Sequence, residues 1–512
     1  MDARRLEMTR REMLKVAGLG AAAGLAPMTA SAQSGAPRRG GSVTVAHPGT
    51  IRQLDPQKQT SADEYIMAYH TYETLVWWNH DGTLQPLLAR AWEKSPDLRT
   101  WTFHLRQGVK FHNGKDLTAA DAKASIERIL DPKTGSLLRS TLDMVDAVET
   151  PDAATVRIRL KVPYSELDSV LSLSRMAIVP SDKIDVLSKE VIGTGAYTLQ
   201  EFVQGSHFSL ARNPNYWRAN LPYLDTIVVR QIPEAATRLT SLQSGQTDVF
   251  WLVPFELFDS LKSARGIALH EATTNFWDPL VMNLNKPPFD NPKVRKAVRL
   301  ALDKDRAITL CLRGHGRKVI LPLVPSDPHY PSQAKDPEPN LAEARKLLAE
   351  AGHPNGFEVP MFIGMGRPAR ERMAEVVCDM LKAVNITCKI QRMPIDKFFA
   401  EIEGKGELYA TGYPASPAAG MHLYPVFHST GSFNAIKWKH PQVDQILEQA
   451  RQTAAPEKAR ELYVRLADLL NEEGPMWIPW VQNIVIATRD RVRGFQAWHD
   501  FRVWLGESWV EA

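Results

Sequence analysis

The sequence predicts an α/β protein, because amphipathic helices alternate along the chain with short β-rich runs. Asn340 and Gly352 bracket the clearest helix, as an N-terminal cap and a C-terminal stop. The apolar residues between them recur at helical spacing and are Leu341, Ala344, Leu347, Leu348 and Ala351. Strand-like runs rich in β-branched residues cover residues 226–232, 386–390 and 484–488.

The N-terminal part of the chain shows the same alternation. Residues 42–47 have the period of a strand, and alternating aromatic and apolar residues predict another strand at 101–105. Thr118 and Asp121 stand three residues apart, as in a capping box. They predict the start of a helix that stops at Pro132.

The first 32 residues predict a removable export signal. Arg10 and Arg11 precede a short apolar stretch at 16–28, and the small residues Ala30 and Ala32 mark a cleavage site. The arginine pair is typical of a twin-arginine signal, which exports proteins already folded. An ordinary secretory signal with a chance pair is the alternative. With no cysteine near the cleavage site, we expect a soluble periplasmic protein without a direct membrane anchor.

The charge of the chain is nearly balanced. The formal charge is +4, and removing the five basic and three acidic residues of the signal leaves about +2. This value excludes nucleic acid and an anionic membrane surface as expected partners. Beyond the signal, no apolar run approaches the length of about 18 residues that a transmembrane helix needs.

The cysteines do not predict a metal site. Cys311, Cys378 and Cys388 are the only three in the chain, and their spacing is not that of a zinc or iron–sulfur site. A disulfide between Cys378 and Cys388 is one possibility, and buried free thiols are the favoured one. No cofactor and no metal are therefore expected.

Short sequence blocks in a fixed order point to one family. The blocks include Trp-Thr-Phe-His-Leu-Arg at 101–106 and Gly-Thr-Gly-Ala-Tyr at 193–197. All seven cover residues 72–76, 86–89, 101–106, 108–114, 193–197, 212–217 and 294–297. Together they resemble the peptide/nickel-type (family 5) extracellular solute-binding proteins, the periplasmic receptors of ABC importers. The resemblance covers nearly the whole mature chain.

The resemblance implies two α/β lobes joined by two crossover segments, with an extra subdomain inserted in the first lobe. The first lobe would comprise residues 33–75, 190–271 and 483–512, the inserted subdomain residues 76–189, and the second lobe residues 272–482. A ligand would bind in the cleft between the lobes and lose most of its contact with water there. A hinge motion would close the lobes on it.

The resemblance also implies where the ligand-facing residues lie. Tyr65 ends the early loop of the first lobe, and its alternative role is packing at a helix start. In nickel-complex receptors of the family an arginine near the position of Arg175 binds ligand carboxylates, and a guanidinium suits a carboxylate. A structural ion pair or a solvated arginine is the alternative.

Aromatic residues near the predicted hinge are further candidates. Phe276 and Trp277 stand where the chain should cross into the second lobe, so one of them could stack on a ligand while the other packs in the core. Trp251 is a similar candidate before the crossing.

The late loop departs from the family pattern. Peptide receptors carry Gly-Trp there, followed by an aspartate that pairs with the α-amino group of the peptide. This chain has Tyr413 at the tryptophan position and Ser416 at the aspartate position, with His422 nearby as a polar option. Because a buried ammonium without an opposing charge is costly, we expect a neutral or anionic ligand. The loop could also be only a spacer.

These observations predict a binding protein and not an enzyme. We expect a monomer that captures a small organic solute and delivers it to the membrane subunits of an ABC permease. An ordinary di- or oligopeptide receptor is one alternative, and a secreted hydrolase is another. A receptor for sensing or a chaperone-like holder is a third. The sequence shows no nucleophile elbow, His-Glu-x-x-His motif or phosphate-binding loop.

Overall fold

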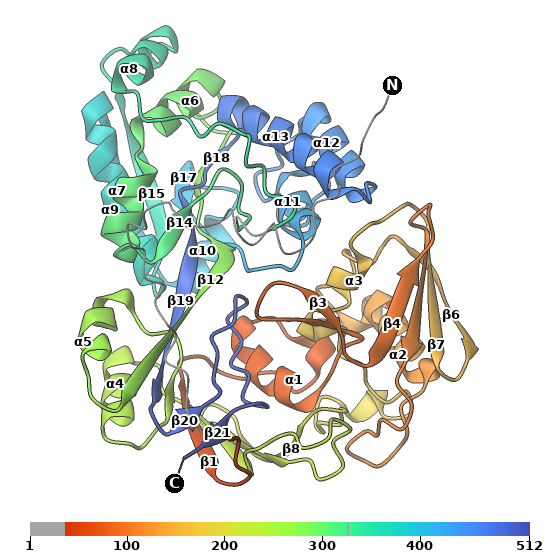
Figure 1. The fold of residues 1–512 in the computed structure, drawn as a ribbon. Helices are drawn as coiled ribbons and strands as arrows, with labels where there is room; N and C mark the ends of the chain where they lie inside the picture. The colour runs from red at the N-terminus through yellow and green to blue at the C-terminus, as the bar shows by residue number, and fades with distance from the viewer. Residues whose placement is uncertain (1–35, 325–326, 512) are drawn as a thin grey trace, which may run out of the picture. The chain divides into compact units, whose positions relative to one another are not determined.

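Three β-sheets and two short strand pairs organise residues 36–324 and 327–511, which the computed structural model describes (Figure 1). The predicted export signal lies outside these residues. Among them, no helix has both the length and the apolar composition to cross a bilayer.

The large sheet has eight strands, seven of them in the order β12-β19-β11-β1-β10-β9-β8, with β14 paired to β19. β1 lies inside the sheet, parallel to both β10 and β11. The predicted strand at 42–47 is therefore confirmed, and its Val43 and Val45 are fully buried. The bounds are β1 (Ser42–His47), β8 (Tyr197–Val203), β9 (His207–Arg212), β10 (Thr226–Gln231), β11 (Val249–Phe250), β12 (Ile267–Trp277), β14 (Gly316–Lys318) and β19 (Trp480–Arg489).

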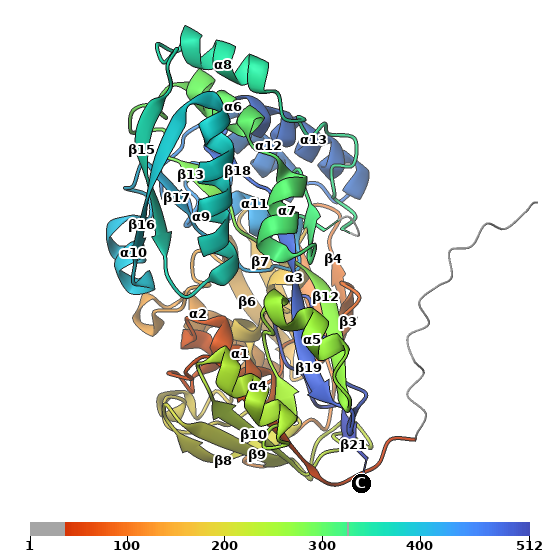
Figure 2. The ribbon, with the colours of Figure 1, turned by 90° about the vertical axis from the view of Figure 1, so that its left-hand side faces the viewer.

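A second sheet of five strands has helices on both faces (Figure 2). In β13, Leu280 and Met282 belong to one core and Val281 to the other, as strict alternation requires. The strands run in the order β16 (Ile386–Met393), β15 (Phe357–Gly364), β17 (Leu408–Ala410), β13 (Leu280–Met282) and β18 (Met476–Trp477). The helices are α6 (Pro292–Ala301), α7 (Lys304–Leu312), α8 (Leu341–Glu350), α9 (Pro368–Leu381), α10 (Ile395–Glu401), α11 (Ala419–Phe427), α12 (Pro441–Arg451) and α13 (Pro456–Glu473).

A third sheet of four antiparallel strands packs on helix α2 (Ala119–Leu130) and has a core of its own. The predicted strand and helix are both present, with Thr118 and Asp121 forming the capping box. The strands run in the order β4 (Ala89–Lys94), β5 (Thr100–Leu105), β7 (Thr155–Leu160) and β6 (Val145–Asp152). Nearby lie α1 (Tyr65–Thr71), α3 (Leu167–Val170) and the pair β2 (Val76–Trp78) and β3 (Leu84–Pro86). We call the four-stranded sheet, together with α2 and α3, the four-stranded subdomain.

β12 and β19 are neighbouring strands, and each of them connects the large sheet to the five-stranded sheet. β12 leads into β13, and β18 leads back into β19. β12 and β19 pair antiparallel from Ile267↔Arg489 to Thr273↔Asn483, and the register shifts before the next pair, Trp277↔Val481. The lobe boundaries predicted at 271/272 and 482/483 fall within this pair of strands and stay a prediction.

The three cysteines are free thiols in the structure. Cys311 and Cys378 are buried in one core of the five-stranded sheet, and Cys388 packs against that core. The thiols of Cys378 and Cys388 contact each other, which raises the pKa of Cys378 and lowers that of Cys388.

Candidate functional site

Two of the predicted ligand-binding residues, Tyr65 and Arg175, contact each other. The guanidinium carbon of Arg175 lies 5.6 Å from the centre of the Tyr65 ring, within the range of a cation–π contact. Both side chains are half-buried, and burial raises the pKa of Tyr65. The Nε of Arg175 is buried and has no hydrogen-bond partner among the described residues. Because buried donors are normally satisfied, this guanidinium has capacity for an acceptor from a ligand.

The side chain of Gln57 fixes the turn that carries this arginine. Its amide donates to the carbonyls of Ser125 (3.0 Å) and Ala177 (3.2 Å). Arg128 donates to the side-chain oxygen Oε1 of Gln57 at 2.7 Å and to Asp55 at 3.1 Å. The early loop, α2 and the segment after the arginine are thus tied together by a buried side chain.

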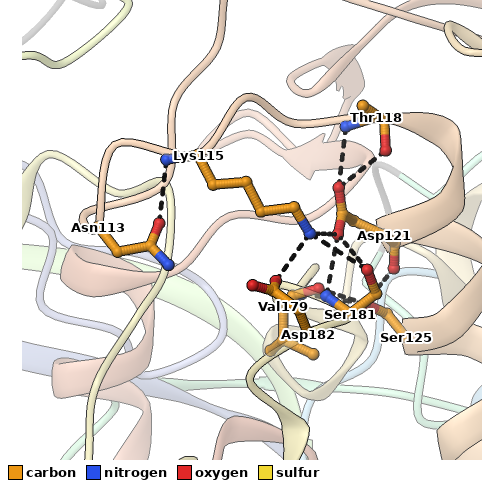
Figure 3. A network of polar contacts seen from close by, with 8 residues as sticks. All are labelled: Asn113, Lys115, Thr118, Asp121, Ser125, Val179, Ser181 and Asp182. Carbon is orange, nitrogen blue, oxygen red and sulfur yellow. Dashed lines mark hydrogen bonds and ion pairs between the residues drawn. The ribbon is translucent and has the colours of Figure 1, made fainter.

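The same segment is tied to α2 a second time, through the network in Figure 3. Asp121 is fully buried and accepts from Lys115 (2.6 Å), Ser181 (2.8 Å and 2.9 Å) and Thr118 (2.9 Å and 3.0 Å). The N–H of Val179 donates to a hydroxyl of α2 at 2.9 Å. The surface formed by Tyr65 and the arginine is therefore built on a rigid support.

The crossing strand orients its two aromatic candidates differently. Trp277 is fully buried, with its ring centre 4.6 Å from that of Tyr413. The backbones of these two residues exchange hydrogen bonds of 2.9 Å and 3.3 Å. Phe276 is half-buried and lies edge-on to Phe501, with ring centres 5.1 Å apart. Of the pair, Trp277 is the core residue and Phe276 the accessible one.

The late loop is held to the crossing strand by Asn275. The amide of Asn275 donates to the Ser416 carbonyl at 2.7 Å and accepts from the Ser416 N–H at 3.1 Å. The same N–H lies 3.1 Å from Nε2 of His422. His422 is buried, and burial lowers its pKa to about 4. This histidine is therefore neutral at pH 7 and already bonded to the loop, while Ser416 stays half-buried.

The carboxylates near Tyr413 are engaged by other groups. Asp278 accepts from Arg370 Nε at 2.7 Å and from the Trp480 indole at 3.3 Å, and both ions of the pair are buried. Glu403 accepts from a threonine hydroxyl at 2.8 Å, and burial raises its pKa. Sequence reasoning limited to the late loop missed both acids, although Asp278 directly follows the predicted aromatic pair.

Trp251 packs inside the large sheet. It is 3% exposed, its ring stacks on His47 with centres 4.4 Å apart, and its indole donates to the Phe501 carbonyl at 2.8 Å. The segment around Phe501 thus connects Trp251 to the ring of Phe276. Sequence reasoning did not identify this C-terminal segment, because Asp500 and Arg502, which flank Phe501, stand far from the other candidates in the chain.

Metal-ligating side chains do not cluster in the described part of the chain. Across residues 36–324 and 327–511, no three His, Cys, Asp or Glu side chains come together as a metal site would require. The candidate site is instead a set of aromatic, hydroxyl and guanidinium groups at the start of α1, on the segment after α3, on β12 and on the loop after β17.

Comparisons with known proteins agree with this architecture. A sequence profile described as bacterial extracellular solute-binding proteins, family 5 Middle, matches residues 83–434. The glutathione-binding protein GsiB of Escherichia coli strain K12 is 29% identical over 472 residues, which are 88% of this chain and 91% of GsiB.

Solved structures show the same fold. The periplasmic binding protein DppA of Helicobacter pylori, solved with the peptide STSA, aligns with a TM-score of 0.82 at 24% identity over 93% of this chain and 99% of DppA. AgaA of A. tumefaciens R10, solved with agropinic acid, aligns with a TM-score of 0.80 at 25% identity over 92% of this chain and 99% of AgaA. The predicted two-lobed α/β fold is confirmed. The chain belongs to the bacterial extracellular solute-binding proteins of family 5, which bind small ligands or peptides and work with ABC permeases.

Proposed function

We propose that this protein is the periplasmic receptor of an ABC importer, and that it captures a small neutral or anionic organic solute between its lobes. The solute would lie between the surface of Tyr65 and Arg175 on the first lobe and the surface of Phe276, Tyr413 and Ser416 on the second. Ligand favours the closed form of such a hinged receptor, and the closed form is the one that docks on the permease. Chemistry on the solute has no place in this role, so a secreted hydrolase is not favoured.

The proposed ligand class rests on the distribution of charged groups around the candidate site. The buried Arg175 Nε has no partner among the described residues, whereas Asp278 is neutralised by Arg370 at 2.7 Å. On the first lobe, Asp500 is engaged by Arg502, with Nε at 2.8 Å from both carboxylate oxygens. A ligand carboxylate gains a charge-assisted bond from the arginine.

A free-amino peptide fits this distribution poorly. Its ammonium would have to lose water next to carboxylates that already have partners, and an uncompensated buried ion costs several kcal/mol. The side chain of Asp63 accepts from a serine hydroxyl at 2.8 Å and has Arg367 of the second lobe as a cationic neighbour. An ordinary peptide receptor is the competing function, supported by the peptide bound to DppA.

Calorimetric titration of the mature protein tests the ligand class. The probes are glutathione and agropinic acid, which are the ligands named for the relatives, and the dipeptide Met-Leu is the contrast. We expect agropinic acid to bind at least ten times more tightly than Met-Leu, whereas tight binding of glutathione, which carries a free α-ammonium, would contradict the ligand class. Arg175→Gln should weaken the binding of agropinic acid by about 10- to 100-fold, the value of a lost charge-assisted bond.

Met-Leu binding with a Kd of about 1 μM or below would overturn the ligand class and favour the peptide receptor. If neither acid binds, native mass spectrometry of protein purified from its own periplasm decides between the two. A single retained acid or neutral compound supports the proposal, and a mixture of peptides contradicts it.

A further inference from the structure

The loop before α3 in the four-stranded subdomain binds two helices of the second lobe. Ser165 donates from its N–H and from its hydroxyl to the carbonyl of Arg451, each at 2.9 Å. Glu166 Oε1 accepts the N–H of Gly420 at 3.2 Å. Arg451 ends α12, and Gly420 lies in the first turn of α11. In Figure 1 this contact lies away from the crossing strands β12 and β19.

Aromatic and apolar side chains complete the contact. The guanidinium carbon of Arg451 lies 5.0 Å from the ring centre of Tyr164 and 4.0 Å from that of Tyr424. The guanidinium thus contacts one ring of the four-stranded subdomain and one ring of α11. Met421 of α11 packs against the core of the four-stranded subdomain. The first turn of α11 is therefore bound to this subdomain by both polar and apolar groups.

The buried acid in this contact is only partly satisfied. Glu166 is 8% exposed, and its Oε2 has no hydrogen-bond partner among the described residues. A Cβ at residue 420 would overlap Oε2, so a larger residue there must displace the Glu166 carboxylate. The positive end of α11 favours the carboxylate, but an unpaired buried oxygen costs free energy. Opening the contact returns this oxygen to water, so the contact is suited to forming and breaking.

α11 connects this contact to the candidate ligand loop. Gly420 and His422 belong to the same turn of α11, and His422 accepts the N–H of Ser416 at 3.1 Å. Only three residues separate Ser416 from Gly420 in the chain. A shift of the first turn of α11 must therefore move the loop that carries Tyr413 and Ser416.

We propose that these residues form a closing latch, with Ser165 and Glu166 on one side and Gly420 and Arg451 on the other. Glu166 is a positioning residue: it touches no solute, but it holds the first turn of α11 and hence the late loop in the closed arrangement. The proposal rests on the receptor function. It predicts that the latch sets the closed population for every solute alike, whereas Arg175 discriminates between solutes.

The latch can be tested without a solute. Hydrogen exchange and small-angle scattering are measured on the mature protein after its retained solute has been dialysed away under denaturing conditions and the protein refolded. The variants are Glu166→Ala, which removes the acceptor, and Glu166→Gln, which keeps one. Gly420→Ala inserts a Cβ against the carboxylate, and Ser165→Ala removes a single bond. Glu93→Ala, an exposed acid of the same subdomain, is the matched control.

We expect Glu166→Ala and Gly420→Ala to speed exchange in residues 416–424 by about tenfold and to increase the radius of gyration. Glu166→Gln should restore most of the protection, because its amide oxygen can accept the Gly420 N–H. Exchange in β5 and the unfolding temperature should stay near the Glu93→Ala values, since the subdomain core is untouched.

Unchanged exchange at 416–424 in both Glu166→Ala and Gly420→Ala would overturn the latch. Loss of protection throughout β5 would also overturn it, since the acid would then be a structural residue. If Glu166→Ala does not fold, Ser165→Ala and Glu166→Gln decide by the same two measurements. Because the latch experiment uses no solute, its result can be interpreted even if the calorimetric test contradicts the ligand class. A negative result for the latch likewise does not affect the proposed ligand class.

Discussion

At the scale of single residues, a buried ion pair lies under the late loop. Asp278 and Arg370 are each about 5% exposed or less and bond at 2.7 Å. The loop can cover them only because residue 412 is glycine: a Cβ at Gly412 would overlap the guanidinium and lie 2.6 Å from the carboxylate. The glycine of the late loop therefore serves the electrostatics of the site, besides giving the backbone room.

Gly412→Ala should destabilise the protein by about 1–3 kcal/mol, the usual cost of overpacking. The added methyl group must displace Arg370 from Asp278 or lift the loop. Urea unfolding measures this change, and Pro414→Ala, at an exposed neighbouring position, is the control. Equal unfolding midpoints for the two variants would show that the loop yields freely at Gly412.

Sequence reasoning found the late loop because its residues are contiguous, but the direction of each side chain depends on packing that the sequence does not show. Tyr413 and Ser416 lie beside the crossing strand as a set, but whether they bind ligand stays a prediction. His422 and Trp277 are buried and engaged with protein groups. Asp278 could not be placed at the site, because its proximity arises only when the crossing strand meets the late loop.

At the scale of elements, helix α2 joins the candidate surface to the rest of the four-stranded subdomain. Burial alone would raise the pKa of Asp121, but the bonds from Lys115, Ser181 and Thr118 outweigh it and hold the pKa below its usual range. A carboxylate whose pKa is lowered in the folded state stabilises that state above the pKa of the unfolded chain, about 3.9. This stability is lost as the pH falls through the lower folded-state pKa.

Asp121→Asn should therefore lower the free energy of unfolding by about 2–3 kcal/mol at pH 7, with a smaller difference from the wild type near pH 3. Chemical denaturation at the two pH values measures both quantities. The control is Asp116→Asn, which removes one partner of the exposed ion pair between Asp116 and Lys110. This variant should change the free energy of unfolding by less than about 1 kcal/mol. A pH-independent difference would contradict the role assigned to the Asp121 charge.

Helices and strands could be predicted where the sequence contains a capping residue or a regular apolar period, and not where it contains neither. The capping residues Thr118 and Asn340 correctly marked the starts of α2 and α8. Leu341 belongs to the apolar stripe that the sequence predicts for α8 but is 37% exposed, since it lies in the first turn of α8. Of the ten residues of β19, the sequence predicts only 484–488 as a strand, because β19 begins inside the Trp-Ile-Pro-Trp segment at 477–480, which has no strand period.

At the scale of the whole molecule, the sheet order was not accessible from periodicity. Pairing of β1 with β10 and of β12 with β19 joins segments far apart in the chain, and local patterns carry no such information. The two-lobed arrangement came from the resemblance, and the family profile and the solved structures confirmed it. The lobe boundaries and the ligand contacts stay predictions.

The arginine pair of the N-terminus predicts that the whole molecule folds before export. Replacing Arg10 and Arg11 together by lysine keeps the charge, so an ordinary secretory signal should tolerate the change, whereas a twin-arginine signal should not. We expect at least a tenfold loss of periplasmic protein, measured by immunoblot of cell fractions. A double change of Arg4 and Arg5 to lysine is the control. Normal export of the Arg10 and Arg11 variant would assign the protein to the general secretory route.

The break in the ladder between β12 and β19 has a mechanical consequence. Between Thr273 and Trp277 the main-chain pairing lapses, and a side chain takes its place: the Thr274 hydroxyl donates to the Gln482 carbonyl at 2.6 Å and accepts from the Phe276 N–H at 3.0 Å. Bending at this joint would strain the hydrogen bonds of the Thr274 hydroxyl, and it would leave the seven regular residue pairs from Ile267 to Thr273 unchanged. We therefore expect bending of the two strands to be concentrated at this joint, where the main-chain pairing of β12 with β19 lapses.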